Sequence, residues 1–229
     1  MGDWIAFWDS EHPIYVNDRH RDVHYRTIAR DIRAHLPAGA TVLDYGCGEA
    51  LHADVIAASA TALILCEAAP KVRAALARRF ADHANIRVCA PEDIAAMPAR
   101  SLDAVVLHSV AQYLAPETLD ALLATFRRLL RESGVLIVGD VVPPHVSVFT
   151  DAAALLRFGV ANGFLVATLV GFARTLFSNY WRLRSQFGLT RYDEAALAAK
   201  LAGSGFSARR ASANIGHNPW RMTFIARPV

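Results

Sequence analysis

The chain has 229 residues, of which 54% are hydrophobic and 20% are charged, and this composition excludes disordered and fibrous proteins. The formal net charge is only +3 and the arginines are spread along the chain, which argues against a nucleic-acid-binding surface. The three cysteines form no Cys-x-x-Cys pair, so neither a zinc site nor a disulfide framework is expected. The N-terminus is acidic and aromatic, unlike a signal peptide, and we therefore expect a cytoplasmic protein.

Short β-rich runs alternate along the chain with longer helical patterns. An aromatic N-terminal cap, residues 1–35, contains a predicted helix from about Asp18 to His35. Five apolar runs predict buried parallel strands, at 41–45, 62–67, 86–89, 103–109 and 134–140. Further helices are predicted at 51–58, 70–82, 116–131 and 193–203. Two final β-rich segments, 206–212 and 221–227, predict a closing hairpin.

These elements predict one domain spanning residues 1–229, with a doubly wound α/β fold. Its seven-stranded sheet is expected to be mostly parallel, with an antiparallel hairpin at the C-terminal edge. Beside this core lies an apolar insertion, residues 151–185, whose most apolar part is FGVANGFLVATLVGFA, residues 158–173. That stretch is too short and too rich in glycine to span a bilayer comfortably.

The insertion allows three interpretations. A helical hairpin over the carboxyl edge of the sheet would form a lid with an apolar inner wall, which implies a greasy or aromatic substrate. Alternatively, it could be the interface of a homodimer, or residues 158–173 could contact a membrane surface and take a lipid from it.

The stretch VLDYGCGEA, residues 42–50, places Asp44 just before a Gly-x-Gly turn. Dinucleotide sites need a third glycine, but Leu51 stands in its place, and Asp44 would repel a pyrophosphate. A ligand with a carboxylate and a separate ammonium fits better, because the ammonium would meet Asp44. Glu67 ends the second strand, the position where an acidic side chain takes both hydroxyls of a ribose.

VLDYGCGEA followed by LILCEAAP resembles the first two motifs of the class I S-adenosylmethionine-dependent methyltransferases. The closing segment YDEAALAAKLAGSGF, followed by a strand, resembles the small-molecule branch of that family. The resemblance implies S-adenosylmethionine as cofactor and S-adenosylhomocysteine as product. It also implies an acidic residue near the adenine amino group, for which Glu92 and Asp93 are candidates, with Asp93 preferred. The implied cofactor-binding residues are Asp44, Gly46, Gly48, Glu67, Ala68, Glu92, Asp93 and His108.

The segment HSVAQYL, residues 108–114, would face the transferred methyl group by the same resemblance. It lacks the Asn/Asp-Pro-Pro-Tyr motif of enzymes that methylate adenine bases or protein amides, so we expect a small-molecule acceptor and no nucleic acid. Methyl transfer from a sulfonium needs alignment above all, and a base only when the acceptor arrives protonated. His108, at the end of a central strand, is the candidate base; alternatively it hydrogen-bonds a neighbouring loop.

Aromatic and acidic residues supply the candidate substrate contacts. Tyr15 and Tyr25 could shield a sulfonium by cation–π attraction, or simply pack in the core. Tyr113 belongs to the segment that faces the methyl group, and Asp140 ends the fifth strand at the same rim, where it could orient the substrate or cap a loop.

His20 and His24 share a helical face, with Asp9, Glu11 and His12 upstream. No third ligand is fixed by spacing, so we predict no metal and expect these residues to line the entrance or cap the helix. The sequence thus predicts methyl transfer to a small, apolar or aromatic acceptor. The alternatives are a nucleotide-dependent oxidoreductase, or a non-catalytic module that binds the cofactor and serves assembly.

Overall fold

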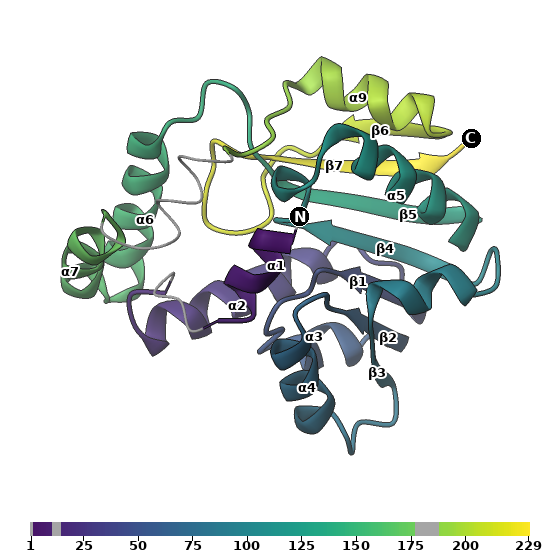
Figure 1. The fold of residues 1–229 in the computed structure, drawn as a ribbon, viewed down its shortest axis with the longest axis horizontal. Helices are drawn as coiled ribbons and strands as arrows, with labels where there is room; N and C mark the ends of the chain where they lie inside the picture. The colour runs from purple at the N-terminus through teal and green to yellow at the C-terminus, as the bar shows by residue number, and fades with distance from the viewer. Residues whose placement is uncertain (1, 11–14, 177–187) are drawn as a thin grey trace.

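A computed structural model describes residues 2–10, 15–176 and 188–229. Its seven-stranded sheet has the order β3-β2-β1-β4-β5-β7-β6. The strands β1 to β5 pair in parallel, and β7 runs antiparallel to both β5 and β6, which confirms the predicted sheet and its C-terminal hairpin (Figure 1). The strands are β1 Ala40–Tyr45, β2 Ala60–Cys66, β3 Ile86–Cys89, β4 Leu102–His108, β5 Leu130–Val141, β6 Phe206–Arg210 and β7 Met222–Pro228.

Helices connect the strands where the helical patterns predict them, with ends set by local chemistry. Asn17 begins α2 by accepting a hydrogen bond from the backbone N–H of His20 (2.8 Å), and Asp193 begins α9 in the same way with Ala196 (2.7 Å). Pro116 opens α5 in its first turn. The helices are α1 Gly2–Trp8, α2 Asp18–Arg33, α3 Ala53–Ala57, α4 Pro70–Arg79, α5 Pro116–Leu129, α6 Val148–Asn162, α7 Leu165–Leu176 and α9 Glu194–Gly203, with 3-10 turns η1 Pro91–Ala96 and η2 Ala111–Tyr113.

The sheet is buried on both faces, which explains why its strands read as continuous apolar runs. On one face, α5 and α9 pack against strand residues in a cluster that includes Leu123, Phe126 and Leu197. On the other face, α2, α3 and α4 form a second cluster that includes Ile32 and Leu76. The carboxyl ends of the strands therefore stand in a rigid frame, which positions the loops that follow them.

The predicted apolar insertion folds into the hairpin of α6 and α7 as far as residue 176, and its remainder, 177–185, lies outside the described residues. Gly163, at φ +73°, ends α6. Gly159 allows close packing, because a Cβ there would lie 2.7 Å from the Thr168 hydroxyl oxygen. The hairpin lies beside α2, beyond the carboxyl ends of β4 and β5 (Figure 1). Within the described part of the chain, no helix has the length and apolar character needed to cross a bilayer.

Candidate active site

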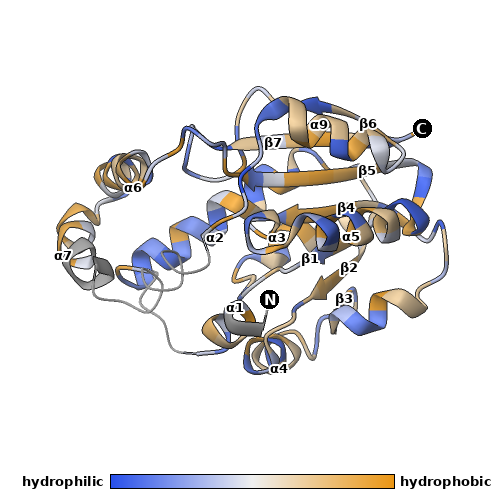
Figure 2. Ribbon diagram, turned by 45° about the horizontal axis from the view of Figure 1, so that its top comes forward, coloured by the Kyte–Doolittle hydropathy of each residue, from blue (hydrophilic) through white to orange (hydrophobic). Residues whose placement is uncertain are grey.

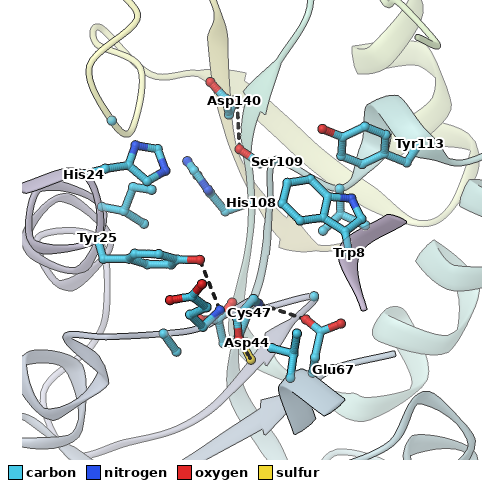
Figure 3. A pocket seen from close by; sticks show the side chains of 18 of the residues that line it. Trp8, His24, Tyr25, Asp44, Cys47, Glu67, His108, Ser109, Tyr113 and Asp140 are labelled. Atoms are coloured by element: carbon cyan, nitrogen blue, oxygen red, sulfur yellow. Dashed lines mark hydrogen bonds between the residues drawn. The ribbon is translucent and has the colours of Figure 1, made fainter. Parts of the chain in front are cut away.

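A cavity of about 1300 Å³ lies at the carboxyl ends of the central strands, enclosed by their loops and by α1, α2 and α6 (Figure 3). Pockets that hold one drug-sized ligand measure about 300–1,000 Å³, so this cavity has room for two molecules side by side. Eleven of the predicted site residues line it: Tyr15, Tyr25, Asp44, Gly46, Gly48, Glu67, Ala68, Glu92, His108, Tyr113 and Asp140.

The loop after β1 needs both of its glycines. Gly46 and Gly48 have φ values of +73° and +59°, which residues with a side chain rarely adopt. A Cβ at Gly46 would lie 2.5 Å from a Val110 methyl carbon, and one at Gly48 would lie 2.9 Å from the Tyr25 hydroxyl oxygen. The loop therefore passes close to the segment after β4 on one side and to α2 on the other.

Two acidic side chains, Asp44 and Glu67, lie next to this loop (Figure 3). The Glu67 carboxylate accepts hydrogen bonds from the backbone N–H groups of Gly48 (2.9 Å) and Ala69 (2.8 Å), which fix its orientation. Asp44 is 8% exposed, and burial, with the Glu67 charge as a second cause, raises its pKa to about 7. A cation beside Asp44 would favour its charged form, so this position suits the ammonium of a ligand.

The structure separates the two candidates for an adenine contact. Glu92 lines the cavity, whereas Asp93 does not. The Asp93 carboxylate instead accepts a hydrogen bond from the backbone N–H of Ala90 (2.8 Å) and caps the 3-10 turn η1. Of the two candidates, Glu92 therefore belongs to the cavity lining, while the Asp93 carboxylate, which the sequence favoured, caps η1.

Tyr25 supports the glycine loop from α2. Its hydroxyl oxygen accepts a hydrogen bond from the backbone N–H of Glu49 (3.0 Å), and its ring lies 5.9 Å from that of Tyr15. Burial raises the pKa of Tyr25 to about 12 and also raises the pKa of Tyr15. Both phenols are consequently neutral, and they form a polar and aromatic wall between the loop and the rest of the cavity.

His108, at the end of β4, points into the cavity (Figure 3). Its Nε2 lies 3.3 Å from the carbonyl oxygen of Ile215. Because a carbonyl only accepts, Nε2 carries the proton and Nδ1 keeps a lone pair. Burial lowers the pKa of His108, so the ring is neutral near pH 7. The predicted hydrogen bond to a neighbouring loop is present, and the lone pair at Nδ1 is compatible with a base.

The Asp140 carboxylate forms hydrogen bonds with three side chains of the protein. It accepts hydrogen bonds from the Ser109 hydroxyl (2.6 Å), the Arg221 guanidinium (2.6 Å) and the Asn214 amide (3.3 Å). Although burial acts to raise its pKa, the Arg221 charge holds the pKa below its usual value. Asp140 and Ser109 both have positive φ, at +60° and +57°, so this network holds a strained backbone at the end of two strands.

Three histidines that line the cavity, His20, His24 and His217, lie close together, and phenylalanine rings pack against two of them. His20 stacks on Phe164 with ring centres 5.0 Å apart, and His217 stacks on Phe158 at 4.6 Å. Burial, with His217 as a second cause, lowers the pKa of His20 to about 4, and burial also lowers the pKa of His24. These rings are therefore neutral.

In the ranges that the structure describes, no three potential ligands gather as a metal site would require, while Glu11 and His12 lie outside those ranges.

Several residues that line the cavity were not predicted as site residues from the sequence. Trp4 and Trp8 of α1 lie against Tyr113, with ring centres 4.6 Å and 5.8 Å apart (Figure 3 shows Trp8). Arg221 and His217 come from the segment that joins β6 to β7. Only folding brings these residues to the site, and no motif marks them; aromatic enrichment of the first residues was the one available signal.

Comparisons with known proteins agree on one fold. Residues 43–138 match the methyltransferase domain family. Magnesium protoporphyrin IX methyltransferase (ChlM) from Synechocystis PCC 6803, crystallised with S-adenosylhomocysteine (SAH), is similar with a TM-score of 0.60 and 16% identity, over 100% of this chain and 94% of that one. The DhpI–SAH complex is similar with a TM-score of 0.62 and 14% identity, over 98% of this chain and 94% of that one.

A third similar structure is the carbon methyltransferase of CurJ, with a TM-score of 0.57 and 13% identity, over 91% of this chain and 55% of that one. Among curated protein sequences, none matches the chain. Identities this low establish the fold and leave the acceptor open.

Proposed function

We propose that this chain transfers a methyl group from S-adenosylmethionine to a small, apolar or aromatic acceptor. Its residues 43–138 match the methyltransferase domain family, and its fold is similar to that of solved methyltransferases. One observation carries the proposal: Asp44 and Glu67 flank a glycine loop in a cavity large enough for a cofactor and an acceptor together.

The residues present fit the cofactor. Asp44, buried with a raised pKa, would regain its charge beside the cofactor's ammonium. Glu67 already has a fixed orientation at the end of β2, where it would accept hydrogen bonds from the ribose hydroxyls. Glu92 lines the cavity, and by the resemblance it would contact the adenine amino group. Side chains at positions 46 and 48 would fill the space between loop, α2 and the segment after β4.

The cofactor supplies an activated methyl group, and the protein's task is to align the acceptor and exclude water. Val148, Phe149, Ala152 and Leu155 of α6 supply an apolar wall to the cavity, which suits a greasy or aromatic acceptor and a lid role for the hairpin. When the acceptor atom arrives protonated, His108 takes the proton at Nδ1, since Nε2 is occupied by its bond to Ile215.

The oxidoreductase alternative gains no support. A dinucleotide's pyrophosphate would lie against the Asp44 and Glu67 carboxylates, and Leu51 replaces the glycine that close helix packing would need. Two of the similar structures described above are methyltransferases, and the third is a complex with SAH.

Calorimetric titration with S-adenosylmethionine, SAH and NAD tests the cofactor. We expect binding of the first two and none of NAD. Asp44→Ala and Glu67→Ala should each weaken SAH binding by about tenfold to a hundredfold, because each removes a charge-assisted hydrogen bond worth about 1.5–3 kcal/mol. Asp54→Ala is the matched control, because Asp54 is an exposed α3 residue outside the cavity lining. Tight NAD binding without SAH binding would overturn the proposal.

A further inference from the structure

The outer side of the α6–α7 hairpin exposes large apolar side chains. Four of them form what we call the apolar patch: Val160 (64% exposed), Val166 (76%), Leu169 (55%) and Val170 (51%). Phe149, at the start of α6, is 81% exposed. Across the residues that the structure describes, Val229 is the one other large hydrophobic residue with such exposure. Figure 2 shows both helices at one end of the molecule, away from the sheet.

Poor packing of the hairpin does not explain the apolar patch, because the inner side of the hairpin is closely packed. A Cβ at Gly159 would lie 2.7 Å from the Thr168 hydroxyl oxygen, and one at Gly171 would lie 2.3 Å from a Val16 methyl carbon. Thr168 and Ala154 are almost fully buried. The hairpin therefore has one side fixed to the protein and an apolar side that faces outward.

Exposed arginines lie on and beside the described part of the α6–α7 hairpin. The sequence from residue 152 to residue 192 contains five arginines and neither aspartate nor glutamate. Of these, Arg157 is exposed on α6, where its guanidinium lies 4.9 Å from the centre of the Trp220 ring. Arg19 of α2 is also exposed and donates a hydrogen bond to the carbonyl oxygen of Asn162 at the hairpin turn (2.5 Å). Apolar side chains with basic neighbours are typical of surfaces that bind anionic lipids.

The cavity reaches the same side of the molecule. Phe149 both lines the cavity and is largely exposed, and Ala152 and Leu155 continue the lining along α6. An apolar path thus leads from the outside of α6 into the cavity. Over the residues that the structure describes, neither α6 nor α7 is long and apolar enough to cross a bilayer.

We propose that the α6–α7 hairpin docks on the surface of membranes that contain anionic lipids, with the apolar patch among the lipid headgroups and the cavity mouth at Phe149 turned toward them. This surface adds a partner to the protein that methyl transfer alone does not require. It would deliver an apolar acceptor to the cavity without passage through water.

Cosedimentation with lipid vesicles tests the docking. Wild-type protein should bind vesicles of phosphatidylcholine with phosphatidylglycerol, and the triple variant V166S/L169S/V170S should bind about tenfold more weakly or less, because it removes the apolar area that enters the interface. V229S is the matched control, since it removes an equally exposed valine outside the hairpin. SAH titration should give wild-type affinity for both variants, which separates loss of docking from misfolding and from failure of the proposed function.

The basic residues have a separate test. R19Q/R157Q should weaken binding to the anionic vesicles about thirtyfold, which corresponds to roughly 1 kcal/mol for each arginine lost, and added salt should reduce the difference. Pure phosphatidylcholine vesicles should bind both proteins equally weakly. Unchanged vesicle binding by the triple variant would overturn the proposal. So would a wild-type dimer, seen by light scattering, that the triple variant converts to a monomer without any vesicle binding.

Discussion

Asp44, the next-to-last residue of β1, carries a carboxyl group that is almost fully buried in the protein. Its pKa of about 7 means that a proton occupies it about half of the time near neutral pH. In the folded protein this raised pKa gives stability that is present below the unfolded-state pKa and is lost as the pH rises through about 7. A ligand ammonium would reverse this effect, because it lowers the pKa of Asp44 by stabilising the charged form.

SAH binding should therefore release protons. Calorimetry near pH 7, in buffers of different ionisation enthalpy, should show release of roughly half a proton, and the affinity should rise with pH up to about 7 and then level off. Asp44→Asn should abolish the release, while Asp54→Asn should leave it intact. Equal heats in all buffers for the wild-type protein would contradict the role given to Asp44.

Local spacing explains which site residues the sequence could predict. Asp44, Gly46, Gly48 and Glu67 lie at or directly after the ends of strands, so a short sequence motif predicts them. Glu92 and Asp93 are neighbours in the sequence, and their spacing alone does not distinguish them. Asp93 accepts a capping hydrogen bond from Ala90, and no sequence pattern predicts this bond. Arg221 could not be predicted at all, because its partners are far away in the chain and meet it only after folding.

Among the secondary-structure elements, three meet at Arg221. Its guanidinium binds Asp140 of β5 at 2.6 Å and Asp151 of α6 at 3.2 Å, from a position just before β7. All three side chains are largely buried. The hairpin is thereby tied to the sheet at the point where the backbone of Asp140 is strained.

Arg221→Met should destabilise the protein by about 3 kcal/mol, because it leaves two buried carboxylates without their cation. Hydrogen exchange should accelerate in α6 and at the end of β5 before it does in β1 or β4. Arg210→Met is the control and should cost less than about 1 kcal/mol, since its ion pair with Glu194 is exposed. Denaturant unfolding gives both values, and equal losses would contradict the link.

The strands and most helices were predictable because their apolar runs are buried on both faces of the sheet. The predicted and observed elements differ where tertiary contacts lengthen an element or form one that has no sequence pattern. β5 starts at Leu130, earlier than predicted, because Leu130 pairs with Leu102 at the start of β4. The helix α1 carries no strong pattern of its own, and its tryptophans pack on Tyr113, which no local signal predicts.

For the molecule as a whole, stability resides in the two apolar clusters on the faces of the sheet, and the hairpin lies outside both. Phe126→Ala should cost about 3–5 kcal/mol in the free energy of unfolding, because Phe126 is fully buried under the sheet. Phe149→Ala, at an exposed position, should change it by no more than about 0.5 kcal/mol. Urea unfolding measures both, and a similar loss in the two variants would contradict this division.

The antiparallel β7 lies between β5 and β6, although it follows both in the chain. During synthesis, β6 and α9 leave the ribosome before the strand that must join them to the sheet exists. A nascent chain that ends before Met222 consequently exposes the edge of β5 and an unpaired β6 at once, and both can pair with other chains. Ribosomal pausing late in the message would thus favour aggregation, whereas pausing between β4 and β5 would leave shorter edges exposed.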